Sequence, residues 1–327
     1  MIKSMKTPRR QIIDLIEQRT IPTEKIETAL TVAQVRPDGE SWRAFIDHLL
    51  LWLGGLALAF AIMFFIAYNW KDLGHFAKFG MVEGFIVLSV VAYCKLAENT
   101  IASKVSLLVA TISIGVLLAL YGQTYQTGAD PWQLFFNWAL LMLPWAVIGR
   151  FPAIWIVWIA LMNVSIILYY QTFRGIFGFF FGFESGMLWI AFLFNTLALI
   201  AWQLLETTWQ WLSERWALRL LAVSSGVPLT WLVLFSIFDH REAGLSSGII
   251  WPLWLVAMYY VYRKVKPDLF MLAGCCLSII TVTVSFLGKH LMRHGEAGAF
   301  LILALFVIGM GGGAALWLKK VHQECQS

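Results

Sequence analysis

Successive long apolar stretches from Leu49 onward constrain the fold of this 327-residue chain more than any other feature. We place them at approximately 49–68, 79–97, 105–122, 132–149, 151–171, 186–205, 217–237, 247–262, 268–287 and 298–318. A helix rises 1.5 Å per residue, so about 20 residues cross the hydrocarbon core of a bilayer. Backbone groups in hydrocarbon must pair within the chain, which favours helices. We therefore expect an all-α, polytopic helical membrane protein, with residues 49–327 forming a bundle of about ten transmembrane helices.

The composition agrees with a membrane protein, because 60% of the residues are hydrophobic and only 13% are charged. Soluble domains are about half apolar and about a quarter charged. The net charge of +5 does not indicate nucleic-acid binding, since no basic run is interleaved with aromatic residues. The expected partners are membrane lipids and not nucleic acid.

Residues 1–48 differ from the rest of the chain, because they contain eight of its 24 Lys and Arg residues. Apolar residues recur there at helical spacing, and Pro22 stands where a second helix can begin. Pro37-Asp38-Gly39 then interrupts the pattern. We expect a small cytosolic N-terminal helical hairpin with a run-up to the membrane, which could dock a protein partner.

The distribution of positive charge predicts the orientation of the helices. With the N-terminus in the cytoplasm and ten spans, 18 of the 24 Lys and Arg residues lie in cytoplasmic segments and six in outer loops. Cytoplasmic loops of membrane proteins carry such an excess. We therefore expect both termini to be cytoplasmic.

A polar stretch between the third and fourth spans stands out, and it runs Tyr-Gly-Gln-Thr-Tyr-Gln-Thr-Gly-Ala-Asp-Pro-Trp over residues 121–132. With the N-terminal hairpin, with Asn69-Trp70 after the first span and with Trp138, it resembles a bacterial family of predicted membrane proteins, domain of unknown function 2157. The family pattern places a Gly-Gln-x-Tyr-x-x-x-Gly-Asp loop before a Trp-rich helix. The Gly-Asp pair is interrupted here by Ala129. The resemblance covers roughly residues 10–150 and implies a bacterial cytoplasmic (inner) membrane, but it implies no activity.

Two interpretations of the 121–132 stretch remain open. It could be a re-entrant loop that binds a ligand or a lipid headgroup, with polar side chains paired in an outer-facing pocket. It could instead be a compact turn with aromatic anchors at the membrane interface. The candidate ligand-binding residues are Gln123, Tyr125, Gly128, Asp130, Trp132, Asn69 and Trp70.

Histidines suggest a second candidate site, because four of the six fall in predicted outer loops. His290 and His294 are four residues apart, so one helical turn would place both on one face, as a metal pair needs. Loops also collect polar residues without any such role. No Walker loop, Gly-x-Gly-x-x-Gly, nucleophile elbow or Cys-x-x-Cys occurs, so no cofactor and no catalytic residue are predicted.

Three classes of function remain. The first is a transporter or flippase-like protein for a small or amphiphilic solute, which should have a polar cavity at the bilayer midplane near Asn137, Asn163 and Asn195. The second is an accessory or assembly subunit of a membrane complex. The third is a membrane-embedded enzyme acting on a lipid-linked substrate at the outer face, which should gather His and acidic residues there.

Overall fold

The computed structural model describes residues 15–16, 20–32, 39–68, 74–97, 100–173, 183–238, 244–291 and 297–324, and every element in these ranges is helical. The N-terminal segment contains a 3₁₀ turn, η1 (Thr23–Lys25), and α2 (Ile26–Val32). The long helices are α3 (Gly39–Tyr68), α4 (His75–Lys95), α5 (Ile101–Tyr125), α6 (Pro131–Gly149), α7 (Pro152–Thr172), α9 (Phe183–Leu205), α10 (Arg215–Phe238), α11 (Gly244–Tyr260), α12 (Leu269–Leu291) and α13 (Ala297–Glu324). A short 3₁₀ turn, η2 (Gln210–Leu212), precedes α10, and a π-helical turn, η3 (Val261–Val265), follows α11.

Eight of the described helices are long and apolar enough to cross a membrane: α4, α5, α6, α7, α9, α10, α12 and α13. The first and eighth predicted spans coincide with α3, which has 30 residues, and α11, which has 17. The molecule is therefore a multi-pass helical membrane protein, while the count of ten crossings depends on α3 and α11. Much of the predicted hairpin lies outside the described residues, and its second half contains α2.

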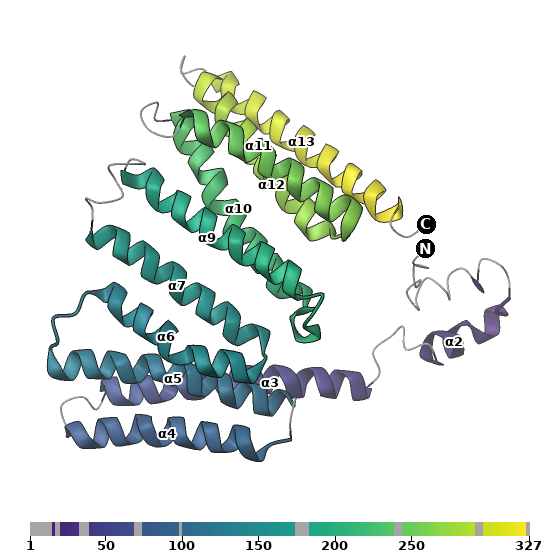
Figure 1. Cartoon of the computed structure of the whole chain (residues 1–327). Coiled ribbons are helices and arrows are strands. Elements are labelled where there is room, and N and C mark those ends of the chain that lie inside the picture. The colour runs from purple at the N-terminus through teal and green to yellow at the C-terminus, as the bar shows by residue number, and fades with distance from the viewer. Residues whose placement is uncertain are drawn as a thin grey trace.

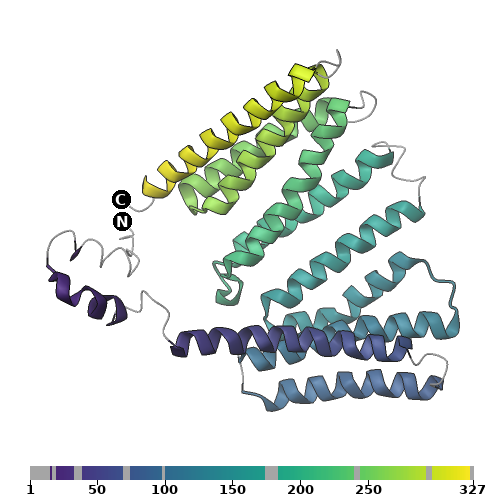
Figure 2. The same ribbon diagram turned by 180° about the vertical axis from the view of Figure 1, so that it is seen from behind.

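Successive long helices run in opposite directions, as Figures 1 and 2 show. The connections 150–151, 206–214 and 261–268 lie on one side of the bundle, and the connection 126–130 lies on the other (Figure 1). The first turn of α3 and the last turn of α13 lie on the same side. Both figures also show α2 beside the bundle and not within it.

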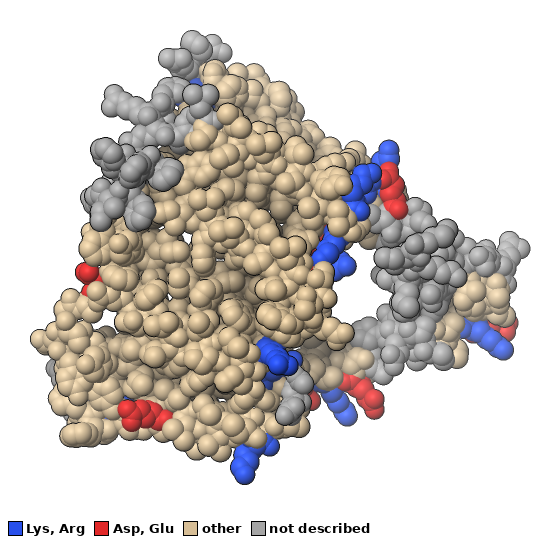
Figure 3. All heavy atoms as spheres, in the orientation of Figure 1, with Lys and Arg blue, Asp and Glu red and all other residues tan. Residues whose placement is uncertain are grey.

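Basic residues cluster on the side that carries the start of α3. In the orientation of Figure 1, most of the visible Lys and Arg side chains line the right-hand edge (Figure 3). Lys95 ends α4, Arg150 follows α6, and Arg215 begins α10 on this side. The asymmetry is the one that the positive-inside rule associates with a cytoplasmic face.

Local sequence explains where several helices begin and end. The Thr100 side chain accepts a hydrogen bond from Ser103 N at 3.2 Å and so caps α5. Pro131 and Pro152 occupy the first positions of α6 and α7, where the missing N–H costs nothing. Arg150 adopts a left-handed conformation (φ 44°) that ends α6 and separates it from α7.

The core of the N-terminal half lies around α5, the most buried of the eight apolar helices. Trp138 of α6 donates its Nε1 hydrogen bond to the Thr111 carbonyl of α5 at 2.9 Å. Its ring lies against Gly115, where an added Cβ would be 2.5 Å from ring atoms. Gly115 thus allows α5 and α6 to approach closely. Helices α7 and α9 pack together and join this half to the helices that follow.

Candidate functional site

The polar 121–132 stretch is a helix end followed by a compact turn. Helix α5 continues through Tyr125, and Gln126 (φ 45°) and Gly128 (φ 63°) then adopt left-handed conformations. Asp130 is the N-cap residue of α6, although its side chain makes no capping hydrogen bond. Five residues therefore connect the two helices, and the described backbone has the turn and not a re-entrant loop.

Gln123 and Tyr125 both have exposed side chains, which favours the interfacial turn over the pocket among the two interpretations of this stretch. They stand on the last turns of a helix, so they project outward instead of folding back. The Tyr125 ring lies 4.9 Å from that of Tyr121 and 6.0 Å from that of Phe79. The hydroxyl of Thr124, by contrast, is buried without a hydrogen-bond partner among the described residues.

Trp132 anchors the start of α6 against the end of α7. Its ring lies 5.0 Å from that of Tyr169 and 6.2 Å from that of Phe173, both in edge-on arrangements. Its carbonyl accepts a hydrogen bond from Ser165 Oγ at 3.2 Å. Its indole Nε1 is buried and has no partner in the described part of the chain. These contacts resemble an interfacial anchor, and binding of a ligand here remains a prediction.

One histidine of the predicted pair, His290, lies in the described part of the chain. His290 lies in the last turn of α12, with Nδ1 3.0 Å from the Phe286 carbonyl and its ring 4.5 Å from the Phe286 ring. His294, Asn69 and Trp70 lie outside the described residues. Within the described ranges, no group of three or more His, Cys, Asp and Glu side chains is placed to hold a metal ion.

Two asparagines meet at the middle of the bundle. Asn163 lies near the centre of α7 and Asn195 near the centre of α9. Asn163 Nδ2 donates to Asn195 Oδ1 at 3.1 Å, and Asn195 Nδ2 donates to Asn163 Oδ1 at 2.6 Å. Each Nδ2 also donates to the carbonyl four residues before it, Ile159 or Ala191, at 2.8 Å. Both amide NH₂ groups are therefore fully used, while each Oδ1 keeps a second lone pair.

A cavity of about 330 Å³, open to the surface of the bundle, adjoins this pair between α7, α9 and α10. Both asparagines line it, together with Ser224 and Pro228 of α10. Pro228 has no N–H to donate to the Ser224 carbonyl four residues earlier, so the helix lacks one hydrogen bond there. The cavity thus offers acceptor oxygens at mid-helix depth, where the sequence places a transporter's cavity. Asn137 is exposed on α6 and does not line it.

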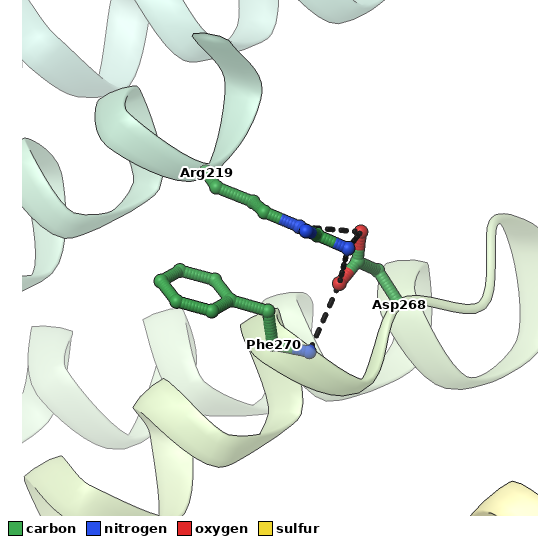
Figure 4. Close-up of polar contacts among 3 residues, drawn as sticks. All are labelled: Arg219, Asp268 and Phe270. Carbon is green, nitrogen blue, oxygen red and sulfur yellow. Dashed lines mark hydrogen bonds and ion pairs between the residues drawn. The ribbon is translucent and has the colours of Figure 1, made fainter. Parts of the chain in front are cut away.

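A second polar cluster lies at the opposite end of the bundle from the 126–130 turn. Arg219 of α10 donates through Nε and Nη2 to the Asp268 carboxylate at 3.1 to 3.3 Å (Figure 4). Asp268 also accepts a hydrogen bond from Phe270 N at 2.9 Å and so caps α12. The Arg219 guanidinium lies 5.4 Å from the centre of the Phe270 ring. Two further ion pairs, Lys266 with Glu206 and Arg263 with Glu324, join neighbouring elements at this end.

Sequence reasoning missed this cluster, because it used Arg219 and Lys266 only as charges that orient the helices. One local signal was present: Asp268 follows a proline and precedes an apolar run, as an N-cap residue does. The partner of Asp268 could not be found in this way, since Arg219 is 49 residues away in the chain.

Comparison with known proteins agrees with the membrane fold. No curated protein and no solved structure matches the chain. A family model described as predicted membrane protein (DUF2157) matches residues 14–155, which include α2 to α6, the 126–130 turn and the first residues of α7. The resemblance to this family is thus confirmed for those residues, and over them the chain is similar to the predicted membrane proteins with the domain of unknown function 2157.

Proposed function

We propose that this protein is a transporter or flippase-like protein for a small or amphiphilic solute. The observation that carries the proposal is the cavity beside Asn163 and Asn195. Transporters commonly bind their solutes near the bilayer midplane at interrupted helices, where backbone carbonyls become available. Pro228 creates such an interruption in α10 next to the two amide oxygens.

The lining indicates what kind of solute would fit. The amide hydrogens of Asn163 and Asn195 are already used, so the polar groups left over are the Oδ1 lone pairs and the carbonyl and hydroxyl of Ser224. A solute that donates hydrogen bonds, through hydroxyl or ammonium groups, would be complementary to them. The remaining lining residues are apolar, among them Ile167, Met187 and Leu188, and would accommodate a hydrocarbon portion.

The distribution of metabolites across the membrane tests this function. Cells lacking the gene would be complemented with wild type or with the double variant Asn163→Leu/Asn195→Leu, and metabolites inside and outside the cells would be measured without preselection. A transporter changes the ratio of inside to outside for at least one solute while the total amount is conserved. We expect wild type to restore that ratio and the double variant to fail.

The hydroxyl pair of Thr196 and Ser225 supplies a matched control, because it also joins two helices but does not line the cavity. Thr196→Val/Ser225→Ala should restore the ratio. A conversion of one compound into another, with a changed total, would instead identify an enzyme. Unchanged distributions in all strains would contradict transport.

An accessory or assembly subunit is the second candidate, and the position of α2 favours it. This helix lies beside the bundle, where a soluble partner could reach it (Figures 1 and 2). Residues 1–48 would then dock that partner at the cytoplasmic face. Deletion of residues 1–40 should leave membrane insertion intact and abolish complementation. Full complementation by the deleted chain would exclude the docking role.

The proposed location is the bacterial cytoplasmic membrane with both termini in the cytoplasm. The basic residues on the side of the start of α3 and the end of α13 support this orientation. The 126–130 turn would then face outward. A cysteine at Thr127 should react with a membrane-impermeant thiol reagent added from outside. Labelling only after permeabilisation would show that the turn faces the cytoplasm and that the proposed orientation is wrong.

A further inference from the structure

An apolar groove runs along α10 and α12 and is separate from the Asn163–Asn195 cavity. Its volume is about 280 Å³, and α11 contributes Trp254 and Met258 to its wall. Small residues form part of its lining, namely Ala222 and Gly226, one turn apart on α10, and Gly274 on α12. A Cβ added at Gly274 would meet no atom within 4 Å, so the groove is open above this residue.

The hydroxyl hydrogens in the groove are all engaged within the protein. Thr230 donates to the Gly226 carbonyl at 2.7 Å and also pairs with Ser278 Oγ at 2.7 Å. Ser278 Oγ in addition accepts the Trp251 indole N–H at 2.9 Å. The third hydroxyl, that of Thr281, donates to the Leu277 carbonyl at 2.9 Å. With these hydroxyl hydrogens engaged and a lining that is otherwise mainly apolar, the groove is complementary to a hydrocarbon chain.

One residue of the groove's lining, Phe270, lies beside Arg219 and Asp268 (Figure 4). Phe270 lines the groove, and the Arg219 guanidinium lies against its ring. Arg219 uses Nε and Nη2 for Asp268, while Nη1 makes no hydrogen bond to any described residue. Its side chain is 39% exposed, so this last donor group is accessible.

Arg215 adds a second positive charge one helical turn earlier on the same face of α10 as Arg219 and the groove. Its side chain is exposed, and it makes no ion pair within the described ranges. Both arginines lie in the first turns of a 24-residue helix, whose positive dipole end also favours an anion. Two carboxylates lie nearby: Asp268 is paired with Arg219, and Glu214 accepts a hydrogen bond from the Trp216 indole and keeps its charge.

We propose that this groove is a binding site for an anionic phospholipid, with one acyl chain between α10 and α12 and the phosphate on Arg215 and Arg219. A hydrocarbon groove whose lining residue Phe270 lies against a guanidinium group is complementary to a molecule with a long apolar tail and an anionic head. Arginine binds phosphate through charge-assisted, often bidentate, hydrogen bonds. This lipid site does not depend on the proposed transport function, and either can fail without the other.

Native mass spectrometry of the full-length protein in detergent tests the site. Delipidated protein would be offered an equal mixture of phosphatidylglycerol and phosphatidylcholine with the same acyl chains. Wild type should retain one phosphatidylglycerol in preference to phosphatidylcholine. Gly274→Leu places a side chain in the open groove and should abolish retention, whereas Gly84→Leu, at another glycine with open space on α4, should leave retention unchanged.

A variant that leaves the groove intact tests the headgroup contact. Arg215→Gln should weaken phosphatidylglycerol binding by about tenfold, the change expected when one charge-assisted hydrogen bond is lost, and should leave phosphatidylcholine unaffected. Its exposed position makes a folding defect a poor explanation for such a loss. Equal retention of the two lipids by wild type would overturn the proposal, and so would undiminished phosphatidylglycerol binding by Gly274→Leu or by Arg215→Gln.

Discussion

Asn163 and Asn195 exchange side-chain hydrogen bonds in both directions, at 3.1 and 2.6 Å, between the midpoints of α7 and α9. Asn195 is only 2% exposed, whereas Asn163 is half-buried, so Asn163 is the more accessible member of the pair. The arrangement fixes the two helices to each other and leaves amide oxygens available to the cavity.

This pair should show energetic coupling. In a double-mutant cycle of Asn163→Leu and Asn195→Leu, either single change leaves the partner amide without its side-chain hydrogen bonds, while the double change removes both polar groups. We expect a coupling energy of about 0.6–1.7 kcal/mol, the range from the average to the maximum for hydrogen bonds between membrane helices. Reversible unfolding in mixed micelles measures it. Strict additivity of the two single changes would mean that the hydrogen bonds contribute nothing.

Gly115 should not tolerate a side chain. Alanine there would place Cβ 2.5 Å from the Trp138 ring, so α5 and α6 would have to move apart. Overpacking of this kind costs about 1–3 kcal/mol. Thermal unfolding of the purified protein should show the loss for Gly115→Ala. Gly84→Ala, in open space on α4, is the control and should be neutral or slightly stabilising. A Gly115→Ala protein as stable as wild type would contradict the described packing.

Substitutions at Asp268 separate its two roles. Asp268→Asn keeps an oxygen that can accept from Phe270 N, whereas Asp268→Ala removes both the cap and the partner of Arg219. Loss of the cap costs about 1 kcal/mol. The ion pair contributes less, because Arg219 is partly exposed to solvent. We therefore expect thermal stability in the order wild type, Asn, Ala. Equal loss for both variants would show that the charge matters more than the cap.

For Gln123 of the family motif we predict an effect on function and not on stability, because its side chain is exposed on α5. Gln123→Ala should leave thermal stability within about 0.5 kcal/mol of wild type, as for most surface changes. If the motif binds a ligand, the same variant should fail to complement a deletion strain. Gln171→Ala, an exposed glutamine near the end of α7 outside the motif, is the matched control. Full complementation by both variants would show that the motif only connects α5 to α6.

The helices could be predicted from the sequence because apolar runs and prolines define them locally. Arg150 and Pro152 were enough to separate α6 from α7. The boundaries near polar residues were less accurate, since α5 continues through Gln123, Thr124 and Tyr125 beyond the predicted end of the span at residue 122. A helix end in a membrane interface tolerates polar residues, so polarity alone does not mark a loop there.

The contacts between helices could be predicted less well. The sequence places Asn137, Asn163 and Asn195 near the bilayer midplane, but only the packing decides that Asn195 meets Asn163 while Asn137 faces outward. The groove beside Gly274 likewise depends on how α10 and α12 cross. Such features join residues that are far apart in the chain, and no local pattern contains them.

Access of a small water-soluble reagent to the midplane cavity tests the central claim most directly. Ala160 lines the cavity on α7, whereas Leu141 is exposed near the middle of α6 and lines none of the cavities described above. Each would be replaced by cysteine in a chain whose four native cysteines are substituted, and a cationic methanethiosulfonate would be added to right-side-out or inside-out vesicles. A transporter that opens alternately predicts reaction at Ala160→Cys from both sides and none at Leu141→Cys. Reaction of Ala160→Cys from only one side, or from neither, would contradict transport through this cavity.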